Sequence, residues 1–183
     1  MRTPYLFCLL VLAACSGSPG GARKKAATSP PQQQLGHASR IIDRAAFRLY
    51  YPAAWTIDTA DDDYDPDALF SIDVSNDNAM SMFFVFDTDI DEDLFVNEQV
   101  KEFRNQLLKK STLTRFREWG RYRGTGVELK GRIMGVFPGR VRIFAHSGAE
   151  SSFINVEQYF DSDSARVAPG MELIAASFLL KQP

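Results

Sequence analysis

Residues 111–160 read STLTRFREWGRYRGTGVELKGRIMGVFPGRVRIFAHSGAESSFINVEQYF. Four segments of this stretch are rich in β-branched and aromatic residues, and glycines or a Pro-Gly pair separate them. This composition predicts four strands, at 111–119, 125–134, 140–146 and 151–160. Turns this short join antiparallel neighbours, so the stretch predicts one antiparallel sheet.

A helix is expected directly before these strands. Apolar residues recur at steps of three and four from Val96 to Leu107, and polar residues fill the opposite face. Acidic residues occupy positions 91–93, and lysines follow the last apolar residue, which complements the helix dipole. The periodicity therefore predicts an amphipathic helix that packs on the sheet.

The rest of the folded region shows the same kinds of pattern. Four further strands are expected before the helix, at 46–50, 55–57, 69–74 and 80–86, and a short helix at 169–177 starts with a proline. The order of elements is four strands, a helix, four strands and a helix. We therefore expect an α+β fold in which helices flank an antiparallel β-sheet.

Two short motifs carry a resemblance to a known family. Residues 47–55 read FRLYYPAAW, and residues 172–178 read ELIAASF near the end of the chain. These motifs, with the order of the elements between them, resemble the Mog1/PsbP-like superfamily (DUF1795/DcrB-like domains). The resemblance spans about residues 40–180 and implies an α/β/α sandwich. It also implies a binding role, and it offers no catalytic residues to carry over.

The N-terminus has the order of residue types found in a secretory signal. A positive start precedes an apolar run at 5–12, which is too short to cross a bilayer as a helix. Residues 12–15 read LAAC and resemble the lipobox of bacterial lipoproteins. This implies that Met1–Ala14 are removed and that Cys15 carries acyl chains such as palmitate. An ordinary signal peptide with an incidental Cys15 is the alternative.

The chain after this signal is expected to have two parts. Residues 15–39 are rich in Gly, Ser, Pro, Ala and Gln, which predicts a flexible linker behind the lipid. The basic residues at 23–25 are expected either to contact anionic lipid head groups or to be solvated. Residues 40–183 are expected to form the folded domain, without a cysteine, because Cys8 lies in the signal. The serine after Cys15 implies, by resemblance to lipoprotein sorting, an outer-membrane location that faces the periplasm.

The domain offers no catalytic set. His146 is its sole histidine, and without a cysteine it cannot supply a zinc site. No Gly-x-Ser-x-Gly elbow accompanies this histidine, and no glycine-rich phosphate loop opens the predicted helix. We therefore expect no enzyme activity and no cofactor, and we interpret His146 as a half-buried residue at a strand end.

Two acidic runs give a metal-dependent alternative. Asp87, Asp89 and Asp91 alternate, as do the aspartates at 61–67, and carboxylates in extended loops can bind calcium. In the run that starts at Asp87, Glu92 occupies the sixth position, where an EF-hand needs glycine. The other interpretation is that these carboxylates are solvated loop charge and helix caps.

Charge is unevenly divided along the domain. Between Leu49 and Val100 every charged residue is acidic, whereas basic residues predominate from Lys101 to Arg142. Several of these basic residues alternate, so each pair is expected to lie on one face of its strand. They define a candidate partner-binding patch: Arg115, Arg117, Arg121, Arg123, Arg140 and Arg142. The alternative is that they are the exposed positions of a half-buried sheet, paired with acidic residues.

These patterns favour a non-catalytic binding or scaffolding lipoprotein of the cell envelope. Its expected contacts are the membrane, through the lipid, and an envelope protein or an anionic envelope component. Export argues against a nucleic-acid ligand. A calcium-dependent or other metal-dependent module, with or without enzyme activity, is the alternative.

Overall fold

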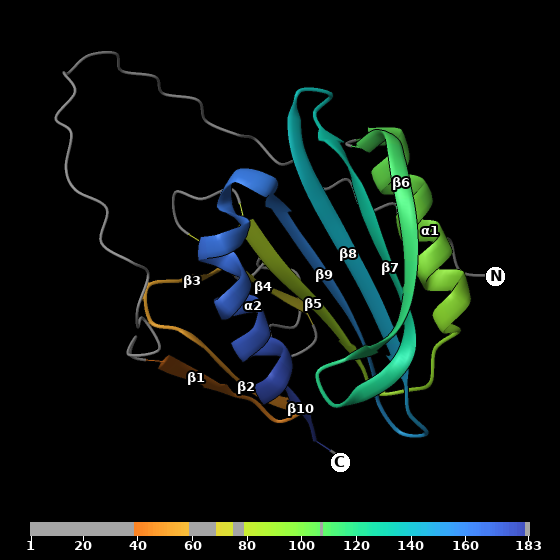
Figure 1. Cartoon of the computed structure of the whole chain (residues 1–183). Coiled ribbons are helices and arrows are strands. Elements are labelled where there is room, and N and C mark those ends of the chain that lie inside the picture. Colours follow the sequence, from red (N-terminus) through yellow and green to blue (C-terminus); the bar gives the residue numbers. More distant parts are fainter. Residues whose placement is uncertain (1–38, 59–68, 75–78, 107, 182–183) are drawn as a thin grey trace, which may run out of the picture. The chain divides into compact units, whose positions relative to one another are not determined.

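Two antiparallel sheets and two α-helices make up the part of the chain that the computed structural model describes, residues 39–58, 69–74, 79–106 and 108–181 (Figure 1). The smaller sheet contains β1 (Ser39–Asp43), β2 (Phe47–Pro52) and β10 (Leu179–Leu180). The larger sheet contains β3 (Thr56–Asp58), β4 (Leu69–Val74), β5 (Ala79–Phe86), β6 (Leu108–Trp119), β7 (Tyr122–Ile133), β8 (Phe137–Ser147) and β9 (Ser152–Phe160). The helices are α1 (Glu92–Gln106) and α2 (Ser164–Ser177), and a 3-10 turn at Asp161–Asp163 precedes α2.

The strand order of the larger sheet, β3-β4-β5-β9-β8-β7-β6, results from one long crossover. After β5, α1 carries the chain to β6 at the far edge. Long hairpins then bring it back through β7 and β8, until β9 pairs with β5. β6 is therefore an edge strand of 12 residues, and two register shifts interrupt its pairing with β7. Such irregularities, together with charged side chains, protect an edge strand against pairing with another chain.

One face of the larger sheet is covered by α1. Val96, Val100 and Phe103 are buried residues of this helix, and they pack in one apolar cluster with residues of β7 and β8 such as Leu129 and Ile143. Alternate residues of a strand point to one face, which gives β7 and β8 this apolar side. The helix expected from the periodicity between residues 96 and 107 is confirmed.

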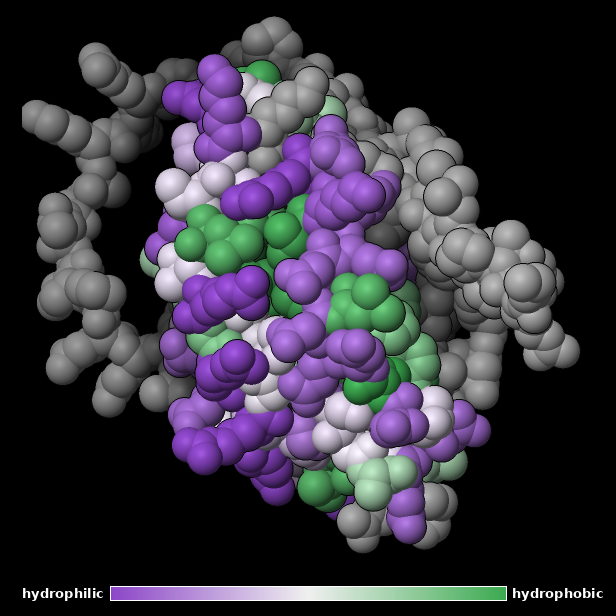
Figure 2. All heavy atoms as spheres, turned by 90° about the vertical axis from the view of Figure 1, so that its right-hand side faces the viewer, coloured by the Kyte–Doolittle hydropathy of each residue, from purple (hydrophilic) through white to green (hydrophobic). Residues whose placement is uncertain are grey.

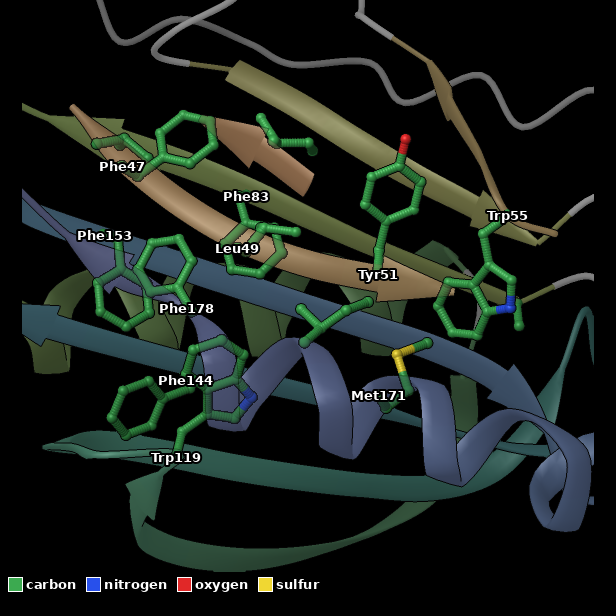
Figure 3. Close-up of a cluster of buried hydrophobic side chains, with 14 of the residues drawn as sticks. Phe47, Leu49, Tyr51, Trp55, Phe83, Trp119, Phe144, Phe153, Met171 and Phe178 are labelled. Atoms are coloured by element: carbon green, nitrogen blue, oxygen red, sulfur yellow. The ribbon is translucent and has the colours of Figure 1, made fainter. Parts of the chain in front are cut away.

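The opposite face of the larger sheet is covered by α2 and the smaller sheet, and its core is aromatic (Figure 3). The ring centroid of Phe178 lies 5.0 Å from that of Phe83 and 4.6 Å from that of Phe153. Trp119 and Met171 belong to the same buried cluster. Burial of each large side chain contributes about 1.5–3 kcal/mol, so this cluster is a main source of stability.

The predicted α+β class, with an antiparallel sheet flanked by helices, is confirmed. The last helix differs from its prediction, because it begins at Ser164 and Pro169 lies inside it. The buried Val167 adds packing to the extra turn. That packing compensates for the backbone hydrogen bond that the proline cannot make.

Two strands were not expected. β1 begins at Ser39, in the last position assigned to the linker, and Ile42 is its one buried residue. β10 has only two residues. Neither has an alternation long enough to predict a strand, and both form because they pair with β2 on its two sides.

Several expectations lie outside the described residues. They are the signal peptide Met1–Ala14, the lipidated Cys15, the linker up to residue 38 and the acidic run at 61–67. In the described part of the chain, no helix has the length and apolar character needed to cross a membrane.

Candidate functional site

Charged side chains gather on the face of the larger sheet that is opposite α1. Two neighbouring cross-strand rows of β7, β8 and β9 carry them: Glu128, Arg142 and Glu157 in one, and Lys130 and Arg140, beside the neutral Tyr159, in the next. Directly opposed residues of antiparallel strands point to the same face, so residues far apart in sequence meet here. We call these six residues the charged rows.

Glu157 is the most deeply buried member of the charged rows, with 1% of the residue exposed. Its Oε1 accepts a hydrogen bond of 2.9 Å from Nε1 of Trp119, and its Oε2 accepts one of 3.1 Å from Nη1 of Arg142. Burial raises the pKa of this carboxyl group, while the charge of Arg142 and the Trp119 hydrogen bond act in the opposite direction. Both carboxylate oxygens are therefore engaged inside the protein.

Arg142 connects the two carboxylates of its row. It pairs with Glu157, and its Nε lies 3.7 Å from Oε2 of Glu128. The guanidinium also lies over the ring of Phe116, 4.9 Å from the centroid, on the edge strand. Gly126 makes room for this ring, because a Cβ atom there would lie 2.4 Å from Phe116. Arg142 is therefore held by two charges and one aromatic face.

The second row is paired as well. Arg140 donates from Nη2 to Oδ1 of Asp161 at 2.8 Å, and its guanidinium lies 5.3 Å from the Tyr159 ring centroid. Lys130 lies 3.0 Å from a carboxylate oxygen of Glu128. The charged rows thus form a network in which positive and negative groups satisfy one another. Such a network stiffens the face and leaves little net charge on it.

The six arginines proposed as one patch do not lie together. Arg140 and Arg142 share the face of the charged rows, whereas Arg115 is opposite Val127 in register and so points to the α1 side. Arg117 donates from Nη1 to Oγ1 of Thr125, which is opposite Ala145 on the same α1 side. The prediction of a single patch was wrong, because it used the alternation within each strand without the register between strands.

The remaining two arginines lie at the turn between β6 and β7. Arg121 donates to the carbonyl oxygen of Ala176 at the end of α2, and Arg123 pairs with Glu118. The Arg123 and Glu118 side chains are 86% and 68% exposed, so this pair contributes little to stability. These two arginines extend the exposed basic surface of the edge strand.

A shallow depression lies where this turn meets α2. Its volume is about 510 Å³, and its lining consists of Gly120, Arg121, Glu172, Ala175 and Ala176. Gly120 has a φ of +56°, and a Cβ atom there would lie 2.0 Å from the carbonyl oxygen of Ala175. The close approach of the turn to the helix therefore requires glycine.

Asp87, Asp89 and Asp91 lie in the connection between β5 and α1. Oδ1 of Asp91 accepts a 3.0 Å hydrogen bond from the backbone N–H of Leu94, which makes Asp91 the N-cap of α1. Asp89 accepts a hydrogen bond from the neighbouring Thr88 hydroxyl. Across the described ranges, no three His, Cys, Asp or Glu side chains are arranged so that they could hold a metal ion.

His146 lies at the end of β8 and is half-buried, in agreement with the interpretation of its sequence position. Its Nδ1 lies 2.8 Å from the carbonyl oxygen of Arg123, and its ring contacts Tyr122 and Phe153. The neighbouring Ser147 hydroxyl accepts a hydrogen bond from the backbone N–H of Ile90. Both side chains hold backbone segments in place.

Glu157 is a member of the charged rows that the sequence patterns did not predict. One signal was available, because a glutamate stands inside the apolar segment SFINVEQYF at 152–160. A charged residue in such a segment is either exposed at an edge or buried with a partner. Only the neighbouring strands and Trp119 show that it is buried.

Comparisons with known proteins found solved structures with a similar fold. No family model matches the chain, and no curated protein matches it. A crystal structure from Bacteroides thetaiotaomicron VPI-5482 is similar, with a TM-score of 0.50 and 13% identity over 81% of this chain. This chain spans only half, 50%, of the length of that one. The likeness shows a shared fold.

Two further solved structures are similar at slightly lower TM-scores. The solution structure of cyanobacterial PsbP (CyanoP) from Synechocystis sp. PCC 6803 has a TM-score of 0.48 and 10% identity, with 83% of this chain and 98% of that chain covered. LpqN, described as involved in cell envelope biogenesis of Mycobacterium tuberculosis, has a TM-score of 0.49 and 12% identity, with 81% and 92% covered.

Proposed function

We propose that this chain is a non-catalytic binding module of the bacterial cell envelope. It is held in the outer membrane by acyl chains on Cys15 and faces the periplasm. The LAAC motif at residues 12–15 supports the anchor. The motifs at 47–55 and 172–178 support a place for the domain among Mog1/PsbP-like domains.

One observation carries the binding role: the charges of the larger sheet divide into a paired set and an exposed basic set. The charges of the charged rows are paired with one another or, for Arg140, with Asp161, and Glu157 has both oxygens engaged. The exposed basic set consists of Arg115, Arg117, Arg121 and Arg123, which we call the edge arginines. Within the described residues, Arg123 alone among these four has an ion-pair partner.

The edge arginines favour an acidic partner. They lie along the edge strand and its turn, where hydrophilic residues cover most of the molecular side that carries α1 and β6 (Figure 2). Guanidinium groups bind carboxylates and phosphates with two parallel hydrogen bonds. We therefore infer that an acidic protein face or another anionic envelope component binds here. An enzymatic or metal-dependent role gains no support from Asp91, whose carboxylate caps α1.

In-cell photo-crosslinking of the full-length protein tests this role. A photo-crosslinking residue replaces the exposed Glu118, between the edge arginines, and irradiated cells are examined for adducts of increased mass. The double variant Arg115→Gln/Arg117→Gln is expected to lose most of the adduct, because charge at an interface speeds association and fixes its orientation.

The matched control is Arg40→Gln/Arg166→Gln. Both residues are exposed and lie on other elements, and the change in net charge is the same. The control is expected to keep the adduct. An adduct that persists in both variants, or disappears in both, would contradict a binding role for the edge arginines.

A further inference from the structure

Three apolar side chains are exposed at the turn between β7 and β8. Met134, Val136 and Phe137 are 60%, 60% and 52% exposed, and the exposed Gly135 and Pro138 complete the segment. Figure 1 shows this turn at the upper end of the larger sheet, above the ends of α1 and α2. We call residues 134–138 the β7–β8 tip. Exposed apolar residues that lie together are candidates for an interaction site, whereas isolated ones are common on protein surfaces.

The conformation of the tip is poorly suited to methionine. The backbone N–H of Val136 donates to the carbonyl oxygen of Ile133 at 3.2 Å, and the two residues between them, Met134 and Gly135, have φ values of 54° and 76°. Asn, Asp and Gly are the residues that favour such a turn. Met134 gains little burial in return, since 60% of it is exposed. A residue that departs from turn chemistry without a packing gain is expected at a functional or strained site.

The tip is held firmly by the sheet beneath it. The ring centroid of Phe137 lies 5.4 Å from that of Phe160 on β9. At Gly139 a Cβ atom would lie 2.5 Å from the Ile133 side chain and 2.9 Å from the carbonyl oxygen of Tyr159, so the strands approach closely. The apolar side chains are therefore presented at a closely packed end of the sheet.

Basic residues surround the base of the tip. Arg132 donates from Nη1 to the carbonyl oxygen of Val136 at 3.0 Å, which holds its guanidinium beside the tip. Lys130 and Lys110 are exposed nearby on β7 and β6. Of the described acidic groups on the charged-row face and in the turn that leads to α2, Glu128 pairs with Lys130 and Arg142, Asp161 with Arg140, and Asp163 with Arg166. Glu128 balances the charge of Lys130, so the positive charge beside the tip comes from Arg132 and Lys110.

We propose that the β7–β8 tip inserts into the interfacial layer of a bilayer that contains anionic lipids. A few apolar side chains above a basic base match the boundary between head groups and acyl chains. Three exposed side chains are too few for a stable protein interface, which buries about 800 Å² on each partner.

This inference uses the membrane anchor of the proposed function to bring the domain to the bilayer. The roughly 24 residues from Cys15 to Ser39 can span up to about 80 Å if fully extended. A strand of 12 residues, the length of β7, spans about 40 Å. The length of the tether therefore allows this end of the sheet to reach the membrane.

The test uses full-length Val136→Cys protein, labelled with an environment-sensitive fluorophore and reconstituted in vesicles of phosphatidylglycerol and phosphatidylethanolamine. Acylation of Cys15 and removal of Cys8 would leave the introduced cysteine as the sole free thiol. The matched control is Ala149→Cys, which is exposed in the turn at the opposite end of β8. A nitroxide on the lipid acyl chain is expected to quench the fluorophore at position 136 at least about threefold more than the one at position 149.

Two further measurements separate the explanations. Arg132→Gln in the labelled protein, or vesicles of phosphatidylcholine alone, is expected to reduce quenching at position 136, because each basic residue near an anionic surface favours binding about fivefold. Equal quenching at positions 136 and 149 would overturn the proposal. A spectral shift that depends on protein concentration, without quenching by the lipid, would indicate a second copy of the chain and would also overturn it.

Vesicle flotation distinguishes failure of the anchor from failure of the tip. If the protein floats but the fluorophore at position 136 is not quenched, the anchor is supported and tip insertion is rejected. If the protein does not float, the lipid anchor is rejected. Tip insertion is then tested without the anchor: an excess of anionic vesicles must by itself shift the fluorescence at position 136. If that shift is absent, tip insertion is rejected as well.

Discussion

The indole Nε1–H of Trp119 donates a 2.9 Å hydrogen bond to Oε1 of Glu157, although β8 and β7 separate their strands in the sheet. Trp119 is 3% exposed and Glu157 is 1% exposed. The bond therefore joins the edge strand β6 to the centre of the sheet. Its acceptor is the Glu157 carboxylate, whose burial in the charged form is unfavourable. The ring of Trp119 also packs against Phe83 and Phe153, so the end of β6 belongs to the aromatic core.

The first prediction concerns the pH dependence that Glu157 creates. Burial raises its pKa in the folded protein, so the folded state binds the proton more tightly than the unfolded chain does. The stability that this proton provides is present below the unfolded pKa and is lost as pH rises through the folded pKa. Glu157→Gln removes that loss, so its unfolding free energy relative to wild type is expected to rise from pH 4 to pH 8. Urea denaturation across this range measures the difference.

The control for this prediction is Glu118→Gln, which neutralises an exposed carboxylate of the same sheet. Its difference from wild type is expected to change little with pH. A Glu157→Gln difference that is constant or falls with rising pH would show that Arg142 and Trp119 outweigh burial.

The second prediction concerns Asp43 on β1. Hydrogen bonds from Arg48 and Lys181 lower its pKa from 3.8 to about 2. A lowered pKa provides stability above the unfolded pKa that is lost as pH falls toward the folded value. Asp43→Asn is therefore expected to be less stable than wild type at pH 6, and the deficit is expected to shrink between pH 4 and pH 2. Thermal denaturation in this window tests it, with Glu150→Gln as an exposed control.

The third prediction concerns Gly170 in α2. A Cβ atom at this position would lie 2.4 Å from Cζ2 of the buried Trp55. Gly170→Ala is expected to lower the unfolding free energy by about 1–3 kcal/mol, because overpacking outweighs the better helix propensity of alanine. Pro169→Ala, at the exposed neighbouring position, is expected to raise it instead. A stabilised Gly170→Ala protein would contradict the tight contact with Trp55.

The fourth prediction separates a helix cap from a calcium site. Asp91→Ala is expected to lower the unfolding free energy by about 1 kcal/mol through loss of the bond to Leu94. Asp87→Ala is expected to have a smaller effect, and calcium in place of chelator is expected to leave the wild-type melting temperature unchanged. Calcium stabilisation of the wild type that Asp87→Ala abolishes would instead support the metal-dependent alternative.

The fifth prediction concerns the lipid anchor. Cys15→Ser is expected to abolish incorporation of labelled palmitate and to release the protein from the membrane fraction, since the acyl chains supply the anchor. Val136→Ser is the matched comparison, because it leaves the lipidation site intact and should keep the label. Palmitate on the Cys15→Ser protein would reject this cysteine as the acylated residue.

Local patterns predicted most of the elements. The helix between residues 92 and 106 and the strands from 108 to 160 follow from side-chain periods and from turn glycines, which act over a few residues. The half-buried position of His146 was predicted in the same way. Where a strand depends on a distant partner, as β1 and β10 depend on β2, the local sequence carries too little signal.

The candidate site was predicted only in part. The alternation of Arg140 and Arg142 correctly put them on one face, and the sequence contains every charge of the rows. It did not indicate that Glu157 is their buried partner, because a glutamate in an alternating strand has the same local pattern whether water or another strand covers it.

The sequence by itself determined the α+β class, the positions of the main elements and the uneven distribution of charge, because these depend on neighbouring residues. The tertiary structure decided that Arg115 and Arg142 lie on opposite faces, that Trp119 reaches Glu157, and that apolar residues remain exposed at the β7–β8 tip. The physical reason is that register and burial are set by pairing between distant strands, and a shift of one residue would reverse every face.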